Sequence, residues 1–148
     1  MILLIEDDPA DARLIQRALT KAGVLVPVVR LTNGEDAILY LRGEHPYDNR
    51  QSYPLPLLLL LDIKLPRKNG FEVLEWVRKQ RDFTRRTPIV MMTSSSHAVD
   101  VNRAYDLGAN SYLVKPETSA QLLELAHLIK AYWLESNEGP AMGAIRGA

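Results

Sequence analysis

Five short apolar runs divide the chain, and each is followed by a stretch in which apolar residues recur at helical spacing. The runs fall near residues 2–5, 26–31, 57–61, 88–92 and 111–114. Runs this short and continuous, such as the all-leucine run 57–61, are typical of strands buried on both faces. Because strands that alternate with helices form parallel sheets, the pattern predicts an α/β fold with five strands and five helices.

The second apolar run contains a proline, Pro27, which indicates where its strand lies in the sheet. Proline has no backbone N–H to donate to a neighbouring strand, so it is tolerated mainly at sheet edges. An edge position for the second strand fits the flavodoxin-like, doubly wound order 2-1-3-4-5. In this order the first and third strands are neighbours, so we expect the residues at their carboxyl ends to meet.

Capping residues mark the predicted helix ends. Asp8 is the expected N-cap of the first helix, Pro9 its first helical residue, and Gly23 is expected to end it. Ser95 or Ser96 is expected to cap the fourth helix. The first helix therefore begins beside the acidic residues that follow the first strand.

Acidic side chains follow two strands that the predicted order makes neighbours. Glu6 and Asp7 come directly after the first strand, and Asp62 follows the third. Open α/β sheets carry their ligand sites at the carboxyl ends of the strands. Clustered carboxylates repel one another unless a cation lies among them, and carboxylate oxygens suit Mg²⁺. The sequence therefore predicts a magnesium site at this edge.

The fourth and fifth strands also end in polar groups. Thr93 closes the fourth strand, and Lys115 follows the fifth. A hydroxyl can donate a hydrogen bond to a phosphoryl oxygen, and an ammonium can neutralise another. With Asp62 as the nucleophile, these groups are the parts of a phosphoryl-transfer site.

Composition argues against several classes of protein. The chain of 148 residues has no cysteine, which excludes disulfides and thiolate metal sites and is compatible with a reducing cytosol. Its 18 Lys and Arg residues balance its 18 Asp and Glu residues, so no overall basic field favours nucleic acid. The apolar runs are shorter than the roughly 20 residues of a membrane span, and Met1 stands directly before the first strand, without room for an export signal. We expect a cytoplasmic protein that binds neither nucleic acid nor membrane.

Four motifs lie in register at strand ends: LLIEDDP, LLDIKLPRKNGFEVL, PIVMMTSSS and AYDLGANSYLVKP. Together they resemble the response regulator receiver domain of two-component signalling over residues 1–134, with 135–148 as a C-terminal tail. The resemblance implies a switch rather than an enzyme. A sensor histidine kinase would supply the phosphoryl group, Asp62 would accept it in a Mg²⁺-dependent reaction, and both gain and loss of the group would be self-catalysed.

The resemblance also assigns the ligands of the metal ion. Mg²⁺ would be held by the side chains of Glu6, Asp7 and Asp62 and by the backbone carbonyl of Lys64. Glutamate stands at position 6 where many members of the family have aspartate, and it is an accepted variant of the pattern.

Four further positions match the family's switch residues. Thr93 matches the switch hydroxyl, Lys115 the family's lysine, and Tyr112 the aromatic residue whose rotamer follows Thr93. Pro116 resembles the family's cis proline, which would aim Lys115 into the site.

The last predicted helix is apolar over a wider arc than a surface helix needs. The residues expected to face the core are Leu122, Leu125, Ala126, Ile129 and Trp133. The residues that widen the apolar arc are Leu123, Leu128, Tyr132 and Leu134. The surplus requires cover, from the tail or from a second protomer, and we expect a homodimer through the fourth and fifth helices and the tail.

Two segments place the chain within the family. Residues 43–56, GEHPYDNRQSYPLP, make a long connection that is either an ordered, partner-contacting loop or a tolerated insertion without a role. The tail leaves no room for an effector domain, so the regulator is expected to act alone through protein contacts. Loop length and the run LPRKNG are similar to the stand-alone regulators paired with bacterial phytochrome kinases.

Two other functions compete with a phosphoaccepting switch. A Mg²⁺-dependent aspartate-nucleophile phosphohydrolase would use similar groups, but such enzymes have a DxD pattern and here Lys64 stands two residues after Asp62. A pseudo-receiver would dimerise without accepting phosphate, which the presence of Asp62, Thr93 and Lys115 argues against.

Overall fold

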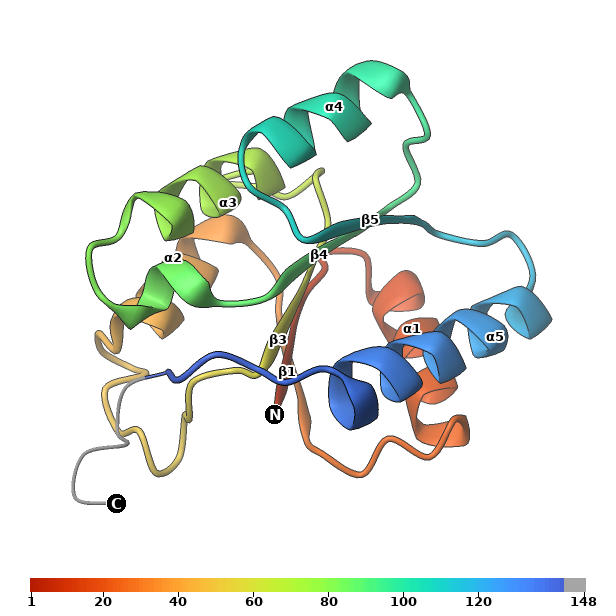
Figure 1. The fold of residues 1–148 in the computed structure, drawn as a ribbon, viewed down its shortest axis with the longest axis horizontal. Coiled ribbons are helices and arrows are strands. Elements are labelled where there is room, and N and C mark those ends of the chain that lie inside the picture. The colour runs from red at the N-terminus through yellow and green to blue at the C-terminus, as the bar shows by residue number, and fades with distance from the viewer. Residues whose placement is uncertain (143–148) are drawn as a thin grey trace.

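The computed structural model describes residues 1–142, which form a parallel sheet with helices on both faces (Figure 1). The strands are β1 (Ile2–Ile5), β2 (Val28–Leu31), β3 (Leu58–Leu61), β4 (Ile89–Thr93) and β5 (Ser111–Val114). The helices are α1 (Pro9–Lys21), α2 (Gly34–Arg42), α3 (Gly70–Lys79), α4 (Ala98–Asp106) and α5 (Ser119–Ile129), with a 3₁₀ helix η1 (Phe83–Arg86) and a π-helix η2 (Lys130–Ser136) that continues α5. The predicted α/β class is confirmed.

The strand order is β2-β1-β3-β4-β5, as predicted, and every neighbouring pair is parallel. The strand that follows Pro27 lies at the sheet edge. Pro27 itself stands just before β2, since the ladder to β1 begins with Ile2 opposite Val28. The Pro27 carbonyl accepts a hydrogen bond from the Ile2 N–H at 2.9 Å. Pro27 thus accepts a hydrogen bond from β1 through its carbonyl, and no neighbouring strand requires an N–H from it.

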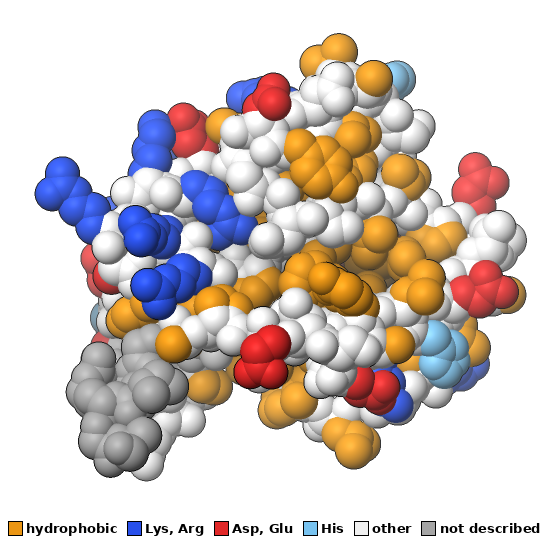
Figure 2. Space-filling view, in the orientation of Figure 1, with side chains coloured by type: hydrophobic (Ala, Val, Ile, Leu, Met, Phe, Trp, Pro, Cys, Tyr) orange, Lys and Arg blue, Asp and Glu red, His pale blue; other side chains and the backbone are white. Residues whose placement is uncertain are grey.

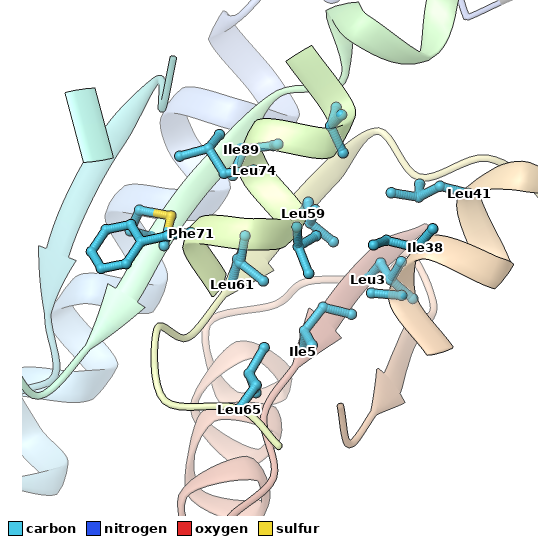
Figure 3. Close-up of a cluster of buried hydrophobic side chains, with 14 of the residues drawn as sticks. Leu3, Ile5, Ile38, Leu41, Leu59, Leu61, Leu65, Phe71, Leu74 and Ile89 are labelled. Carbon is cyan, nitrogen blue, oxygen red and sulfur yellow. The ribbon is translucent and has the colours of Figure 1, made fainter. Parts of the chain in front are cut away.

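Two hydrophobic cores lie on opposite faces of the sheet, because successive strand residues point to opposite sides. Figure 3 shows one core, in which Leu3, Leu59 and Leu61 of the sheet meet side chains of α2 and α3. The other core packs the alternate strand residues, such as Leu4 and Leu60, against α1 and α5. The central strands are therefore covered on both sides, which is why their sequences are almost wholly apolar.

The start of α1 agrees with its predicted cap. Asp8 Oδ1 accepts hydrogen bonds from the backbone N–H groups of Ala10 at 2.8 Å and Asp11 at 3.2 Å, and Pro9 is the first helical residue. Gly23 follows the helix at φ 88°, a left-handed conformation that favours glycine. The cap fixes the direction of α1 as it leaves the acidic end of β1.

The predicted cap of α4 is wrong by one or two residues. His97 stands at the N-cap position and makes no side-chain cap. Ser95 instead donates from its hydroxyl to Asp100 Oδ2 at 2.6 Å and accepts from the His97 N–H at 3.3 Å. Its carbonyl also accepts from the Tyr112 hydroxyl at 2.8 Å. These contacts hold Ser95 outside the helix, so α4 begins later than the serine run suggests.

The long connection 43–56 is ordered by tyrosines that pack against the hydrophobic core on the α2 and α3 side of the sheet. Three tyrosines, Tyr40, Tyr47 and Tyr53, pack with ring centroids 5.1 to 6.0 Å apart. The Arg50 guanidinium donates to the carbonyls of Tyr40, Leu41 and Tyr53 at 2.8 to 3.1 Å, which satisfies groups at the end of α2. The loop therefore closes over the end of α2.

We expect Gly70→Ala to lower the free energy of unfolding by about 3 kcal/mol, because there is no space for another carbon at this position. A Cβ there would lie 2.1 Å from the Asp62 carbonyl oxygen, where α3 begins close under the loop that follows β3. Gly139→Ala is the control, since no atom lies within 4 Å of its added carbon. Urea denaturation of both variants measures the difference, and equal stability would contradict the close approach.

Candidate functional site

The sheet register brings two acidic residues together. Ile5 of β1 is paired with Leu61 of β3, so Glu6 and Asp62 each stand one residue beyond the pair. The Asp62 N–H donates to the Ile5 carbonyl at 3.1 Å, which continues the ladder to the acidic residue itself. Carboxylate oxygens of Glu6, Asp7 and Asp62 lie within 4.8 Å of one another, with Glu6 and Asp62 buried and Asp7 exposed. The three acids that the strand order predicted to meet do so.

Backbone contacts hold this acidic edge in place. The Arg30 guanidinium, from the edge strand β2, donates to the carbonyls of Glu6 at 2.9 Å and Asp7 at 3.1 Å. Glu6 Oε2 accepts from the Asp8 N–H at 3.2 Å, and Asp62 Oδ1 accepts from the Ile63 N–H at 2.7 Å. Each buried carboxylate thus has one oxygen bound to the backbone, and its second oxygen faces the centre of the site.

Lys115 reaches these second oxygens from the end of β5. Its backbone N–H donates to the Thr93 carbonyl at 2.8 Å, which extends the ladder between β4 and β5. Its ammonium donates to Glu6 Oε1, to Asp62 Oδ2 at 3.0 Å and to Asp11 Oδ2 at 3.1 Å. Since an ammonium has three donors, all of them are used. The ladder to β4 therefore aims Lys115 at the acidic edge.

Asp11 is a site residue that the sequence reasoning missed. It stands on the first turn of α1, three residues after the cap, and its side chain is 41% exposed. Its partner Lys115 lies 104 residues further along the chain. An acidic residue on a first helical turn is common for reasons of the helix dipole alone, so no local signal distinguishes it.

Burial and charge act in opposite directions at the centre of the site. Burial raises the pKa of the Glu6 carboxyl to about 7, which the Lys115 hydrogen bond opposes and the charge of Asp62 reinforces. Burial also acts to lower the pKa of the Lys115 ammonium, but its hydrogen bonds to Glu6 and Asp62 outweigh this and the pKa is raised. Lys115 is therefore fully charged at neutral pH and serves as the counter-ion of the buried carboxylates.

The donor set fits a hard divalent cation. Mg²⁺, Mn²⁺ and Ca²⁺ take carboxylate and carbonyl oxygens, and three carboxylates converge here. Lys64, the fourth predicted ligand, lies two residues beyond Asp62 with an exposed side chain. Its carbonyl as a ligand stays a prediction.

The two predicted switch residues lie on β4 and β5. Thr93 is buried at the end of β4, where it pairs with Val114 of β5. Tyr112 is half-buried on β5, and its hydroxyl donates to the Ser95 carbonyl in the loop between β4 and α4. This hydrogen bond connects β5 to the loop at Ser95, which is two residues after Thr93.

The expected cis bond before Pro116 is wrong, because the Lys115–Pro116 peptide bond is trans. Among residues 1–142 the cis peptide bond lies between His45 and Pro46. Lys115 needs no cis bond to enter the site, since its own N–H is fixed by the Thr93 carbonyl.

The chain belongs to the response regulator receiver domain family, which it matches over residues 2–127. It is 36% identical over 141 residues to the response regulator Rcp1 of Synechocystis sp., covering 95% of this chain and 93% of that protein. It is 39% identical over 140 residues to the probable methanogenesis regulatory protein FilR2 of Methanothrix harundinacea, covering 95% and 87%. Members of this family are signalling switches that bind divalent metal, and they are not classed as enzymes.

Solved structures agree with the fold, and one of them contains a bound divalent metal ion. The Mn²⁺-bound form of Rcp1 superposes with a TM-score of 0.85 at 36% identity, covering 95% of this chain and 98% of that one. The phosphorylated cyanobacterial phytochrome response regulator RcpA superposes with a TM-score of 0.86 at 37% identity, covering 95% and 97%.

Within residues 1–142, no helix is long and apolar enough to cross a membrane.

We expect the raised pKa of Glu6 to make the metal-free protein less stable as the pH rises from about 4.5 to 7. In this window the folded Glu6, which faces Asp62 and Lys115, still binds a proton that the unfolded chain has released. The folded state therefore holds more protons, and raising the pH favours unfolding. This contribution is fully present below pH 4.5 and is lost by the time the pH has passed 7.

The measurement is urea denaturation in chelator at pH 5 and pH 8, with Glu6→Gln as the reference because it stays uncharged. The stability of wild type relative to Glu6→Gln should be greater at pH 5 than at pH 8. A difference between the two proteins that does not change with pH would contradict the raised pKa.

Proposed function

We propose that Asp62 accepts a phosphoryl group from the phosphohistidine of a sensor histidine kinase, in a reaction that requires Mg²⁺. The observation that carries the proposal is the convergence of three carboxylates and one ammonium at a single sheet edge. Asp62 is the one carboxylate of the three that follows the central strand β3 and also contacts Lys115. The phosphorylated protein then signals through contact with other proteins.

The transfer breaks a P–N bond of the phosphohistidine and forms a P–O bond to an Asp62 carboxylate oxygen. Bound Mg²⁺ supplies positive charge that reduces repulsion between the carboxylate and the incoming phosphoryl group. Lys115 would supply a further positive charge to the phosphoryl oxygens, which the position of its ammonium 3.0 Å from Asp62 Oδ2 in the metal-free protein supports. The chain's main contribution is positioning, which a loose phosphoryl-transfer transition state chiefly requires.

Thr93 and Tyr112 would carry the response away from Asp62. Thr93 would move toward Asp62 so that its hydroxyl donates to a phosphoryl oxygen. The Tyr112 side chain would then turn into the space that Thr93 has left. Tyr112 would then release the Ser95 carbonyl, which it binds at 2.8 Å in the unphosphorylated state. Because the Ser95 hydroxyl is also hydrogen-bonded to Asp100 of α4, a movement of this loop would be transmitted to the start of α4.

The kinase is proposed to be of the phytochrome type and the protein to work in the cytoplasm. The similarity to RcpA, a phytochrome response regulator, extends over 95% of this chain, and the similarity to Rcp1 covers the same share. A similarity over this share of the chain is not confined to the phosphorylation motifs.

We expect one phosphate to be added to the wild-type chain when a small phosphodonor and Mg²⁺ are supplied together, as measured by intact mass. Asp62→Asn should gain none, because an amide is not a nucleophile toward phosphorus. Chelation of the metal should slow labelling by roughly a hundredfold or more, since positive charge near the transferred group is a main source of rate. Equal labelling of the mutant, or no labelling of wild type, would contradict the assignment.

The proposed homodimer interface is the face formed by α4, β5 and α5 together with the C-terminal tail, of which residues 143–148 lie outside the described residues. The exposed large hydrophobic side chains of these elements and of the helical turn after α5 are Val99, Tyr105, Val114, Leu128 and Tyr132. Figure 2 shows hydrophobic side chains gathered between α4 and α5. A groove of about 630 Å³ opens beside them, between the β4–β5 end of the sheet and the last helical turns. Exposed apolar patches of this kind mark interaction sites, and a second protomer with the same patch would cover both.

The wild-type chain is expected to give a two-chain mass by light scattering at micromolar concentration. Leu128→Glu should weaken this dimer about tenfold or more, because the side chain is 65% exposed on the proposed face and a charge there must be buried. Leu25→Glu is the matched control, since Leu25 is 96% exposed in the connection between α1 and β2, which is not part of the proposed interface. A one-chain mass for the wild type would contradict the dimer.

A further inference from the structure

We infer that Asp11 is a positioning residue that receives the Lys115 ammonium when a divalent cation binds among Glu6, Asp7 and Asp62. By offering the ammonium an alternative partner, Asp11 frees the oxygens that the cation needs. The inference rests on the metal binding of the proposed function and deepens it, because it names what makes room for the metal.

Lys115 and a divalent cation require the same oxygens. Two of the three acceptors of the ammonium are Glu6 Oε1 and Asp62 Oδ2, and both residues belong to the carboxylate group that fits a metal. A cation placed among these carboxylates would repel the ammonium and compete for its acceptors. Lys115 must therefore give up at least part of its contact with Glu6 and Asp62 when the metal enters.

Asp11 is the acceptor of Lys115 that lies outside the metal-fitting group. Its Oδ2 already accepts from the ammonium at 3.1 Å, whereas the carboxylates that converge within 4.8 Å are Glu6, Asp7 and Asp62. A shift of the ammonium toward Asp11 would keep one charged partner and release the others. The move would not leave a half-buried ammonium without a counter-ion, which is the costly alternative.

The structure contains space on the Asp11 side of Lys115. A small hollow of about 40 Å³ is lined by Asp11, Leu14, Ile15, Lys115, Pro116 and Leu122. A water molecule occupies about 30 Å³ of the liquid, so the hollow can accept a group the size of an ammonium. The aliphatic residues of this hollow can cover the methylene groups of Lys115. Asp11 is the acidic residue of the lining, and it can pair with the ammonium.

Asp11 is also held where it can serve as this partner. Its backbone N–H donates to the Asp8 cap at 3.2 Å, which ties it to the first turn of α1. Because the Asp11 carboxylate is 41% exposed, its ion pair with Lys115 is screened by water and adds little to stability. The contact is better suited to receiving a moving charge than to holding the fold together.

The test is a double-mutant cycle in which the full chain is titrated with Mg²⁺ alone by calorimetry, without phosphodonor. The four proteins are wild type, Asp11→Asn, Lys115→Gln and the double variant. We expect Asp11→Asn to weaken Mg²⁺ binding roughly threefold to tenfold in the wild-type background, within the range measured for coupled neighbours. In the Lys115→Gln background the same change should alter binding less than about twofold, because no ammonium remains to be received.

Glu117→Gln is the charge-matched control, since Glu117 is exposed two residues after Lys115 and its replacement removes the same charge. Its effect should stay below about twofold, and thermal melts of all variants check that each is folded. An equal loss from Asp11→Asn in both backgrounds would mean that Asp11 acts through space on the metal, and the inference would be wrong. No loss in the wild-type background would also overturn it.

The result separates this inference from the proposed function. If Mg²⁺ binds and the cycle behaves as expected but Asp62 gains no phosphate, the proposed function alone fails. If Mg²⁺ binds and phosphate is added while the cycle shows no coupling, the role of Asp11 alone fails. If the wild type does not bind Mg²⁺, both fail.

Discussion

The attraction between one ammonium and the carboxylates at the sheet edge is the interaction on which the site depends. Glu6 and Asp62 are both buried, and two buried carboxylates side by side would repel each other and lose the solvation of water. The Lys115 ammonium lies between them, with its donors divided among Glu6, Asp62 and Asp11. Lys115 is thus a stand-in for the positive charge that a divalent cation would bring.

This arrangement makes the site a place of exchange between two cations. Lys115 stabilises the acidic edge in the metal-free state, yet the same contacts oppose metal entry. Each buried carboxylate is also held through its other oxygen, which does not contact Lys115. Glu6 accepts there from the Asp8 N–H, and Asp62 accepts from the Ile63 N–H. These hydrogen bonds would keep the carboxylates in position if a divalent cation replaced Lys115 as their counter-ion. Preorganised groups of this kind lower the reorganisation that a charged reaction requires.

The site is connected to the proposed dimer face through β4 and β5. A backbone hydrogen bond joins Lys115, just after β5, to Thr93 at the end of β4. On β5, the Tyr112 hydroxyl donates to the Ser95 carbonyl. Ser95 in turn binds Asp100 on the first turn of α4. A change at Asp62 that moves Thr93 therefore has a short route of packed and bonded groups to α4 and β5, where the exposed hydrophobic residues lie.

Much of the fold could be predicted because it depends on local patterns. The five apolar runs are strands, Pro27 precedes an edge strand, and Asp8 caps α1 as its position indicated. Once the strand order is known, the parallel register of β1 and β3 brings Glu6, Asp7 and Asp62 together. The cap of α4 and the Lys115–Pro116 bond were predicted wrongly, because contacts with Asp100, Tyr112 and Thr93 from other elements decide them.

The sequence by itself therefore determined the strands, their order and which acidic residues share an edge, since these depend on burial periodicity and on the position of Pro27, which has no backbone N–H. Only the tertiary structure decided that Asp11 joins Glu6 and Asp62 as a partner of Lys115. Lys115 and Asp11 lie 104 residues apart and meet because α1 packs against α5, the helix that follows Lys115, and no local pattern predicts this packing. Long-range charge pairing is a property of the assembled layers, because an ion pair forms wherever packing brings two charges within reach.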